Sequence, residues 1–234
     1  MTLLTVVREP GDLVEPAADW LAAEIAAAID ARGACAVALS GGRTPEPVYR
    51  ALASAEGIGW EKVTVFFADE RAVPPHHAES NYRMVRAALL SRVPIPEAGV
   101  HRMEAERQDR DAAAREYAQQ LPPALDLLVL GIGADGHTAS LFPRSPALDE
   151  RRRLVVPAVG TKTPVERMTI TPPVIEAARR VAVIATGGDK AAAVARALEG
   201  PLAPRELPGQ LARRGAWFLD RAAAAMLTAP RVDA

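Results

Sequence analysis

An aspartate and a histidine, Asp135 and His137, lie two residues apart directly behind an apolar run at residues 125–130. The run is typical of a buried strand of a parallel sheet, and the glycines of residues 131–136 let the backbone turn sharply where it ends. Open α/β sheets bind ligands at this carboxyl edge, and histidine is the side chain best suited to proton transfer near neutral pH. The segment therefore predicts an enzyme site, with both residues as candidate catalytic groups.

The same glycines also fit the dinucleotide-binding pattern G-x-G-x-x-G. That pattern requires a helix that opens at the third glycine and an acidic residue about 20 positions further on. Pro143 and Pro146 would break such a helix, and residues 151–153 are all arginine. We therefore favour a catalytic turn over a nucleotide site.

A second glycine-bearing turn, at residues 40–45, separates a predicted strand from a predicted helix. Adjacent glycines, a helix N-terminus and the Arg43 guanidinium together suit a phosphate group, while Thr44 could cap the helix and Pro45 fits its first position. An ordinary strand-to-helix turn with a good cap is the alternative, and the spacing of a Walker loop is absent. The candidate phosphate-binding residues here are Ser40, Gly41, Gly42, Arg43 and Thr44.

Charged residues also end the next predicted strand, as Asp69, Glu70 and Arg71. Adjacent side chains point in different directions, so at most two of them can face one pocket. Asp69 or Arg71 could contact sugar hydroxyls or stabilise a developing negative charge. A solvated loop with a local ion pair is the alternative.

Two further cations, Arg167 and Lys190, are expected near the same edge, where they could close on a phosphate from the side opposite Arg43. Each could instead be a surface cation. His76 and His77 are consecutive and lack a third donor, so no metal site is expected.

Other reactive side chains are assigned to structure. His101 has no matching partners and is expected to be structural. Cys35 lies within an apolar run and is expected in the core, and no G-x-S-x-G nucleophile elbow occurs.

These side chains need a scaffold, and the alternation of apolar runs with helical patterns predicts one. We expect an α/β fold with a Rossmann-like, mostly parallel sheet and helices on both faces, as a single domain over residues 1–234. The predicted strands are residues 34–39, 63–67, 126–130, 154–159, 167–171, 181–185 and 217–219. The predicted helices are residues 15–32, with Gly33 as C-terminal cap, and 45–55, 79–91, 110–120, 189–198 and 221–227.

Composition limits the class of protein. The 234 residues are 49% hydrophobic but only 4% aromatic, which predicts an aliphatic core. A net charge of −1 argues against nucleic acid as a partner, and a single cysteine fits a reducing compartment. No basic leader or stretch of 18 apolar residues is present, so we expect a cytoplasmic protein without membrane contact.

The ensemble of motifs resembles the 6-phosphogluconolactonase family over nearly the whole chain. The most specific part is Gly-Ala-Asp-Gly-His-Thr-Ala-Ser-Leu-Phe-Pro at residues 133–143. The resemblance implies hydrolysis of 6-phospho-D-glucono-1,5-lactone to 6-phosphogluconate in the oxidative pentose phosphate pathway, without metal or organic cofactor. The other segments that carry it are residues 40–45, 69–71, 79–82, 167–171, 187–190 and 217–220.

Two other functions share features of this pattern. Glucosamine-6-phosphate deaminases have a similar fold but carry a glutamate in a Phe-Asn-Glu-Pro stretch, where residues 140–143 here are Ser-Leu-Phe-Pro. Sugar-sensing effector domains of repressors also look similar, but no room or basic patch for a helix-turn-helix precedes Ala34. Both features favour the lactonase. We expect a monomer or weak homodimer that binds a phosphosugar lactone.

The chemistry of a lactone fits these residues. A lactone is an activated ester, so His137 could take a proton from the attacking water and return it to the leaving ring oxygen. Asp135 would orient the turn or the imidazole, and Arg71 or the N–H groups of Gly41 and Gly42 would stabilise the oxyanion. We expect the 6-phosphate to be held by Arg43, Thr44, Arg167 and Lys190.

Overall fold

Six parallel strands form one sheet through the middle of the molecule in the computed structural model, which describes residues 3–161 and 163–228. Every neighbouring pair is parallel. The run predicted as a buried strand is β5, and all its residues are buried. The strands are, in order across the sheet, β1 (Leu4–Val7), β9 (Ala216–Asp220), β8 (Arg180–Ala185), β5 (Leu127–Leu130), β2 (Cys35–Leu39) and β3 (Val63–Phe67).

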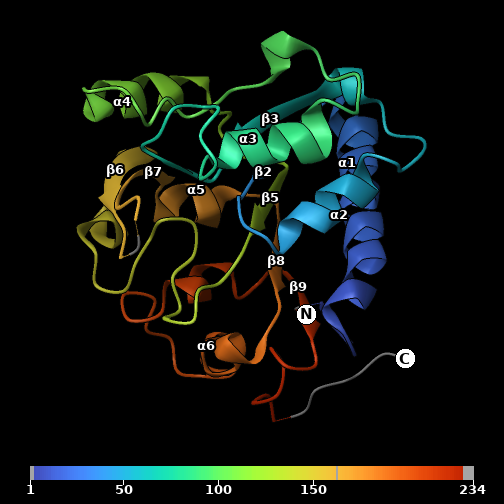
Figure 1. Cartoon of the computed structure of the whole chain (residues 1–234), viewed down its shortest axis with the longest axis vertical. Coiled ribbons are helices and arrows are strands. Elements are labelled where there is room, and N and C mark those ends of the chain that lie inside the picture. The colour runs from blue at the N-terminus through green and yellow to red at the C-terminus, as the bar shows by residue number, and fades with distance from the viewer. Residues whose placement is uncertain (1–2, 162, 229–234) are drawn as a thin grey trace.

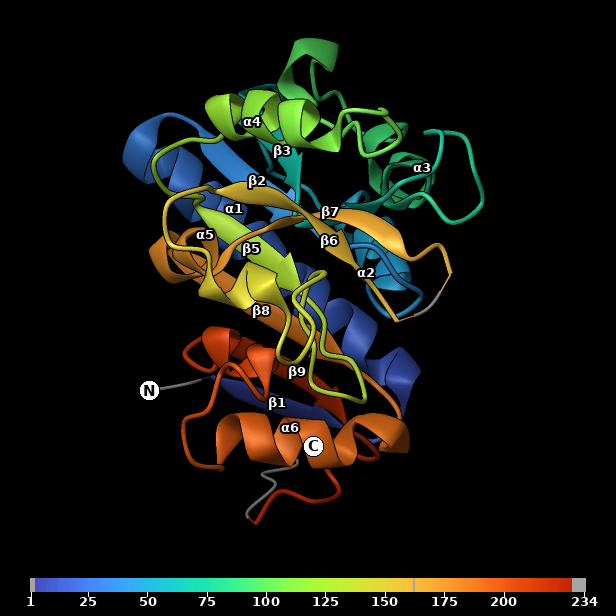
Figure 2. The same ribbon diagram turned by 90° about the vertical axis from the view of Figure 1, so that its left-hand side faces the viewer.

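Helices lie on both faces of this sheet, which confirms the predicted fold class. In Figure 1 the sheet is seen between α1 and α2 on one side and α5 with a smaller sheet on the other. Figure 2 shows the smaller sheet in front and α1 behind. The helices are α1 (Val14–Arg32), α2 (Pro45–Leu52), α3 (Asn81–Val85), α4 (Arg110–Gln120), α5 (Pro172–Ala177) and α6 (Ala191–Leu198).

The smaller sheet is antiparallel and consists of β4 (Asp69–Arg71), β7 (Glu166–Ile170) and β6 (Val155–Val159). Ala68 joins it to the large sheet, because its N–H donates to the Leu39 carbonyl and its carbonyl accepts from the Ile170 N–H, both at 2.9 Å. The strands predicted at 154–159 and 167–171 thus exist but lie outside the parallel sheet. Through Ala68 the chain leaves β3 and enters the second sheet at Asp69.

Several predicted boundaries were wrong. The segment 221–227 forms turns instead of a helix, although the Asp220 carboxylate accepts the Ala223 N–H at 2.7 Å as an N-cap would. The hydrogen bonds from Ala225 N–H to the Ala222 carbonyl and from Leu227 N–H to the Ala224 carbonyl span three residues rather than the four of an α-helix. β1 and β4 were not predicted, since both are too short to show a period. The helix expected over 79–91 starts at Asn81 and continues after α3 as a π-helical turn, Arg86–Leu90.

The core is aliphatic, as composition predicts, and one cluster of buried side chains extends over both sheets. Cys35 is buried in it, which raises the pKa of its thiol to about 12. Gly33 ends α1 with φ of 79°, as predicted for its cap. No helix in residues 3–161 and 163–228 is both long and apolar enough to span a bilayer. The prediction of one domain over residues 1–234 extends beyond the described residues at both ends.

Candidate active site

A cavity of about 350 Å³ opens at the carboxyl ends of β2 and β5. The chain runs from β2 outward to β3 and later returns to the other side of β2 with β5, so this is the point where the strand order reverses. Open α/β sheets bind ligands at such switch points. The sequence-predicted residues that line the cavity are Ser40, Gly41, Gly42, Arg43, Thr44, Asp69, Arg71, His137, Arg167 and Lys190.

The turn after β5, which we call the Asp–His turn (residues 131–138), presents His137 to the cavity. Asp135 does not line the cavity but contacts the imidazole, with its Oδ1 2.5 Å from Nδ1 of His137. The same oxygen accepts the backbone N–H of His137 at 3.1 Å. Gly133 makes room for this pair, because a Cβ there would lie 2.1 Å from Nδ1.

The electrostatics of the pair favour proton transfer at the other ring nitrogen. The hydrogen bond from His137 lowers the pKa of Asp135, so the carboxylate stays ionised and accepts a hydrogen bond from the Nδ1–H of the imidazole. An imidazole that donates through Nδ1 carries its lone pair on Nε2. The ring also packs on Phe142, with centroids 4.7 Å apart. The turn therefore holds a histidine whose Nε2 can act as a base.

The segment 201–214 packs against the Asp–His turn. Leu207 contacts Gly136 so closely that a Cβ at Gly136 would lie 2.1 Å from Cδ1 of the leucine. The carbonyl of Gly136 accepts the N–H of Gly209 at 2.8 Å. Gly136 also has φ of 87°, which a side chain would strain. The turn is thus fixed by its neighbours as well as by its own hydrogen bonds.

The turn after β2 lines the cavity, but two of its side chains act differently from the prediction. Thr44 makes no capping hydrogen bond; its hydroxyl lies 3.3 Å from that of Thr186, because residue 44 already has helical backbone angles. The Ser40 hydroxyl donates to the Val129 carbonyl at 2.8 Å and so joins β2 to β5. Gly42 has φ of 114°, and Pro45 takes the first helical position as expected.

The charged segment 69–71 is strand β4, not a solvated loop. Asp69 and Arg71 line the cavity while Glu70 points away from it, as the alternation of neighbouring side chains predicts. Asp69 is buried and accepts the Ser140 hydroxyl at 2.6 Å. Glu70 is also buried, with 3% of its surface exposed.

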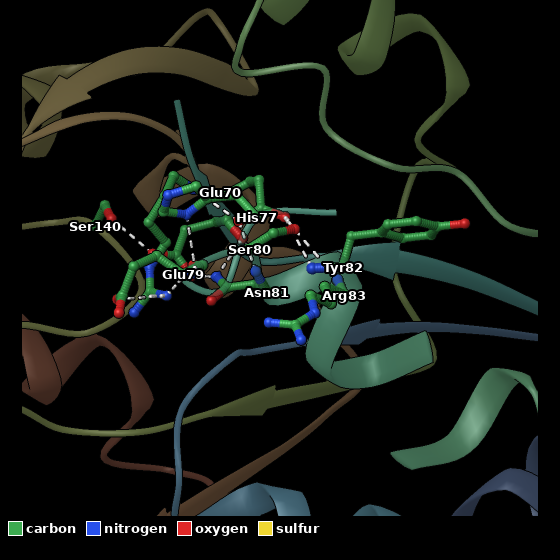
Figure 3. Close-up of polar contacts among 10 residues, drawn as sticks. Glu70, His77, Glu79, Ser80, Asn81, Tyr82, Arg83 and Ser140 are labelled. Atoms are coloured by element: carbon green, nitrogen blue, oxygen red, sulfur yellow. Dashed lines mark hydrogen bonds and ion pairs between the residues drawn. The ribbon is translucent and has the colours of Figure 1, made fainter. Parts of the chain in front are cut away.

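Glu70 forms what we call the Glu70 anchor, in which its carboxylate holds the start of α3 (Figure 3). Oε1 accepts the backbone N–H groups of Arg71 and Asn81, each at 2.8 Å. Oε2 accepts the N–H of Tyr82 at 2.8 Å and the hydroxyl of Ser80 at 3.0 Å. Burial raises the pKa of Glu70, and the four donors act in the opposite direction. The anchor fixes the segment that carries Asn81 into the cavity wall.

The cations surround the cavity from different elements. Arg43 is exposed after β2, and Arg167 is buried within β7 of the smaller sheet. Lys190 ends a short 3-10 helix after β8 and contacts the Asp189 carboxylate at 2.5 Å. Burial lowers the pKa of Arg167, although a guanidinium keeps its charge at neutral pH. This arrangement places positive charge on several sides of one cavity.

Other interpretations of the sequence can now be compared with the structure. No helix opens at Gly136; residues 134–143 form turns and a short bridge, as the prolines imply. Within the described part of the chain, no three His, Cys, Asp or Glu side chains are grouped to hold a metal ion. His101 stacks on Phe66 with centroids 4.8 Å apart, outside the cavity lining.

Sequence reasoning missed the residues that hold the wall of the smaller sheet. Asn81 lines the cavity and is buried, but it was not a candidate. Glu70 accepts the Asn81 N–H, and Ser140 donates to Asp69, so both bonds join different segments of the chain. Two signals were available: residues 79–82 are among the segments that carry the family resemblance, and Ser80 is a residue type that suits a helix N-cap and does accept the Arg83 N–H at 3.2 Å.

Comparisons with known proteins agree with this geometry. The family described as glucosamine-6-phosphate isomerases/6-phosphogluconolactonase matches residues 8–219. A 6-phosphogluconolactonase from Synechocystis is 40% identical over 224 residues, 90% of this chain and 92% of that protein. One from Homo sapiens is 43% identical over 217 residues, 86% of this chain and 83% of that protein. The structure of 6-phosphogluconolactonase from Trypanosoma brucei has a TM-score of 0.84 at 28% identity and covers 97% and 99% of the two chains.

Proposed function

The chain belongs to the glucosamine-6-phosphate isomerase/6-phosphogluconolactonase family, and on that premise we propose that it hydrolyses 6-phospho-D-glucono-1,5-lactone with His137 as general base. Its relatives at about 40% identity are hydrolases named 6-phosphogluconolactonase, and it is an enzyme of that kind. The product is 6-phospho-D-gluconate, in the oxidative pentose phosphate pathway.

One observation carries the proposal: Nδ1 of His137 contacts Asp135 at 2.5 Å while the imidazole lines the cavity. The carboxylate holds the proton on Nδ1 and leaves Nε2 as the base. His137 takes a proton from water as its oxygen attacks the lactone carbonyl. It then returns that proton to the ring oxygen when the C1–O5 bond breaks, so one group serves both steps.

The tetrahedral intermediate carries negative charge, and the cavity offers donors for it. Arg71 lines the cavity, and its buried Nε has no hydrogen-bond partner among the described residues. The backbone N–H groups of Gly41 and Gly42, two residues without side chains of their own, are the other candidates. Donors fixed before the reaction stabilise an oxyanion without reorganisation.

The 6-phosphate is assigned to the cations. Arg43 and Lys190 stand at the ends of the parallel strands, and Arg167 faces them from the smaller sheet. Thr44 and the glycine turn before α2 add neutral contacts. Binding the remote phosphate holds the reacting carbon near His137, which lowers the entropic cost of the reaction. Asp69 faces the same space and is assigned to the sugar hydroxyls.

We extend the proposal to the setting of the reaction. A single cysteine and the missing membrane-length apolar stretch fit a cytoplasmic enzyme. The proposed chemistry uses side chains and backbone N–H groups of the protein, so it requires no metal or organic cofactor. We expect a monomer or weak homodimer.

The test follows proton release from freshly made 6-phosphogluconolactone, corrected for spontaneous opening. We expect strong acceleration by the wild-type protein. Asp135→Asn should lose roughly 10–10³-fold in kcat, because its amide can donate to Nδ1 of His137 and so hold the imidazole with its proton on Nε2, where the base is needed. No acceleration by the wild-type protein would refute the lactonase proposal. Ammonia release from glucosamine 6-phosphate would instead identify a deaminase.

A further inference from the structure

The amide oxygen of Asn81 is a buried acceptor without a partner. Asn81 is 2% exposed and lines the cavity, and among the described residues no donor reaches its Oδ1. Buried polar groups are nearly always hydrogen-bonded, and the exceptions are frequent at functional sites. The oxygen therefore marks a position where a donor is to be expected when the cavity is filled.

The orientation of this amide is fixed by its other atoms. Nδ2 of Asn81 donates to the backbone carbonyl of Asp69 at 2.8 Å and to its Oδ1 at 3.1 Å. A flipped amide would bring its oxygen against both acceptors, so the assignment of oxygen and nitrogen is determined. The Asn81 backbone N–H is held by Glu70 at 2.8 Å, so the residue as a whole is clamped (Figure 3).

Gly41 leaves the space that the oxygen occupies. A Cβ at Gly41 would lie 1.8 Å from Oδ1 of Asn81, closer than any real contact. The backbone at Gly41 does not have positive φ, so its lack of a side chain serves this close approach rather than a special turn. The acceptor thus lies at the wall next to the glycine turn before α2.

The chemistry of the substrate decides which group this acceptor can bind. The phosphate oxygens, the carbonyl oxygen and the ring oxygen of the lactone are all acceptors. The donors of the lactone are its hydroxyls at C2, C3 and C4. We propose that Oδ1 of Asn81 accepts a hydrogen bond from one of these ring hydroxyls and so makes Asn81 a specificity residue. This rests on the proposed lactonase function.

The expected effect follows from the cost of an unsatisfied group. A site built around a substrate hydroxyl discriminates against the analogue that lacks it, because its buried acceptor then has no partner. Such a loss corresponds to roughly 5–150-fold in kcat/KM. The wild-type protein should therefore discriminate against one deoxy-lactone by about that factor.

The experiment measures kcat/KM by proton release for the parent lactone and for its 2-deoxy, 3-deoxy and 4-deoxy analogues. Wild type and Asn81→Ala are compared, with a urea midpoint to establish folding. We expect Asn81→Ala to lose activity on the parent lactone and to show at least about fivefold less discrimination against one analogue. Ser80→Ala is the matched control, because it loosens the same helix start and leaves the Asn81 side chain in place.

Each outcome decides the proposal. Ser80→Ala should lower activity on all four lactones by one common factor, whereas Asn81→Ala should not. A wild type that hydrolyses all four lactones equally well overturns the role of Asn81, even if Asn81→Ala does not fold. Equal losses for Asn81→Ala on every lactone also overturn it. A wild type inactive on the parent lactone overturns the proposed function and this inference with it.

Discussion

The Asp–His turn and the Glu70 anchor support two walls of the same cavity, and each depends on one carboxylate. The two carboxylates lie in opposite environments. Asp135 has a side chain 42% exposed, and its bond to one histidine lowers its pKa. Glu70 is 3% exposed, and burial raises its pKa despite four donors. One carboxylate is therefore partly exposed beside the candidate catalytic histidine, and the other is buried in the wall of the smaller sheet.

The difference separates chemistry from positioning. The proposed base has to meet water and substrate, and the Asp–His turn is partly exposed, with the two side chains of the pair two residues apart. The wall proposed to select substrate has to be rigid, and the Glu70 anchor consists of hydrogen bonds from a buried carboxylate to a separate segment. We expect changes in the turn to alter turnover, and changes in the anchor to alter stability first.

The strongest test of this comparison is His137→Ala. Loss of the proposed base should lower kcat by roughly 10²–10⁴-fold with the fold intact. Steady-state kinetics on fresh lactone, with a urea midpoint, measures both quantities. His76→Ala is the control, since His76 is exposed and outside the cavity lining, and it should leave kcat unchanged. Near-normal turnover of His137→Ala would exclude the base assignment.

Glu70→Ala tests the other region. Its removal leaves the N–H groups of Asn81 and Tyr82 without their acceptor, so the free energy of unfolding should fall by about 2–4 kcal/mol. Urea denaturation measures the loss. Glu56→Ala, at an exposed position, should change it by less than about 0.5 kcal/mol. Equal stability of the two variants would contradict the anchor.

Lys190→Ala and Arg167→Ala test the proposed contacts with the 6-phosphate. Each removes one charge-assisted contact, so KM should rise roughly tenfold with a smaller change in kcat. Michaelis constants on fresh lactone provide the measurement, and Lys62→Ala, an exposed cation away from the cavity, should leave KM unchanged. If both cavity variants keep the normal KM, the phosphate lies elsewhere.

The smallest effect concerns pH. The pKa of Glu70 is raised from 4.5 in the folded state, so the part of the stability that depends on its titration is full below that pH and is lost as pH rises through the raised pKa. The hydrogen bonds that the carboxylate accepts contribute separately. The pKa of Asp135 is lowered from 3.8, so its stabilisation is present above that pH and is lost as pH falls through the lowered pKa. Unfolding midpoints measured across both windows should show that Glu70→Gln removes the first trend and Asp135→Asn the second. Unchanged trends would contradict the two directions.

The sequence predicted the Asp–His turn because its determinants are local. Glycines, an apolar strand and a two-residue spacing all occur within residues 125–137, and β5 places them at the sheet edge. Every strand of the parallel sheet except β1 was predicted for the same reason, since these strands alternate with helices in the chain. Roles for the individual residues stay predictions until the variants above are measured.

The cavity wall formed by the smaller sheet and the start of α3 could not be predicted from local patterns. Asp69 meets Ser140 across 71 positions, and Glu70 meets Tyr82 across 12. The antiparallel pairing of β4, β7 and β6 depends on register between separate segments, which no single segment encodes. Thr44 was wrongly expected to cap α2, because its residue type suits a cap while its backbone angles do not.

The space at Gly133 has an evolutionary consequence. The imidazole and the carboxylate fill the volume where a Cβ of residue 133 would lie, 2.1 Å and 2.6 Å from their nearest atoms. Every missense change of a glycine codon adds at least that carbon atom. Any missense change at position 133 would therefore displace the side chains of His137 and Asp135. Descendants of this gene should carry glycine there for as long as they use the histidine.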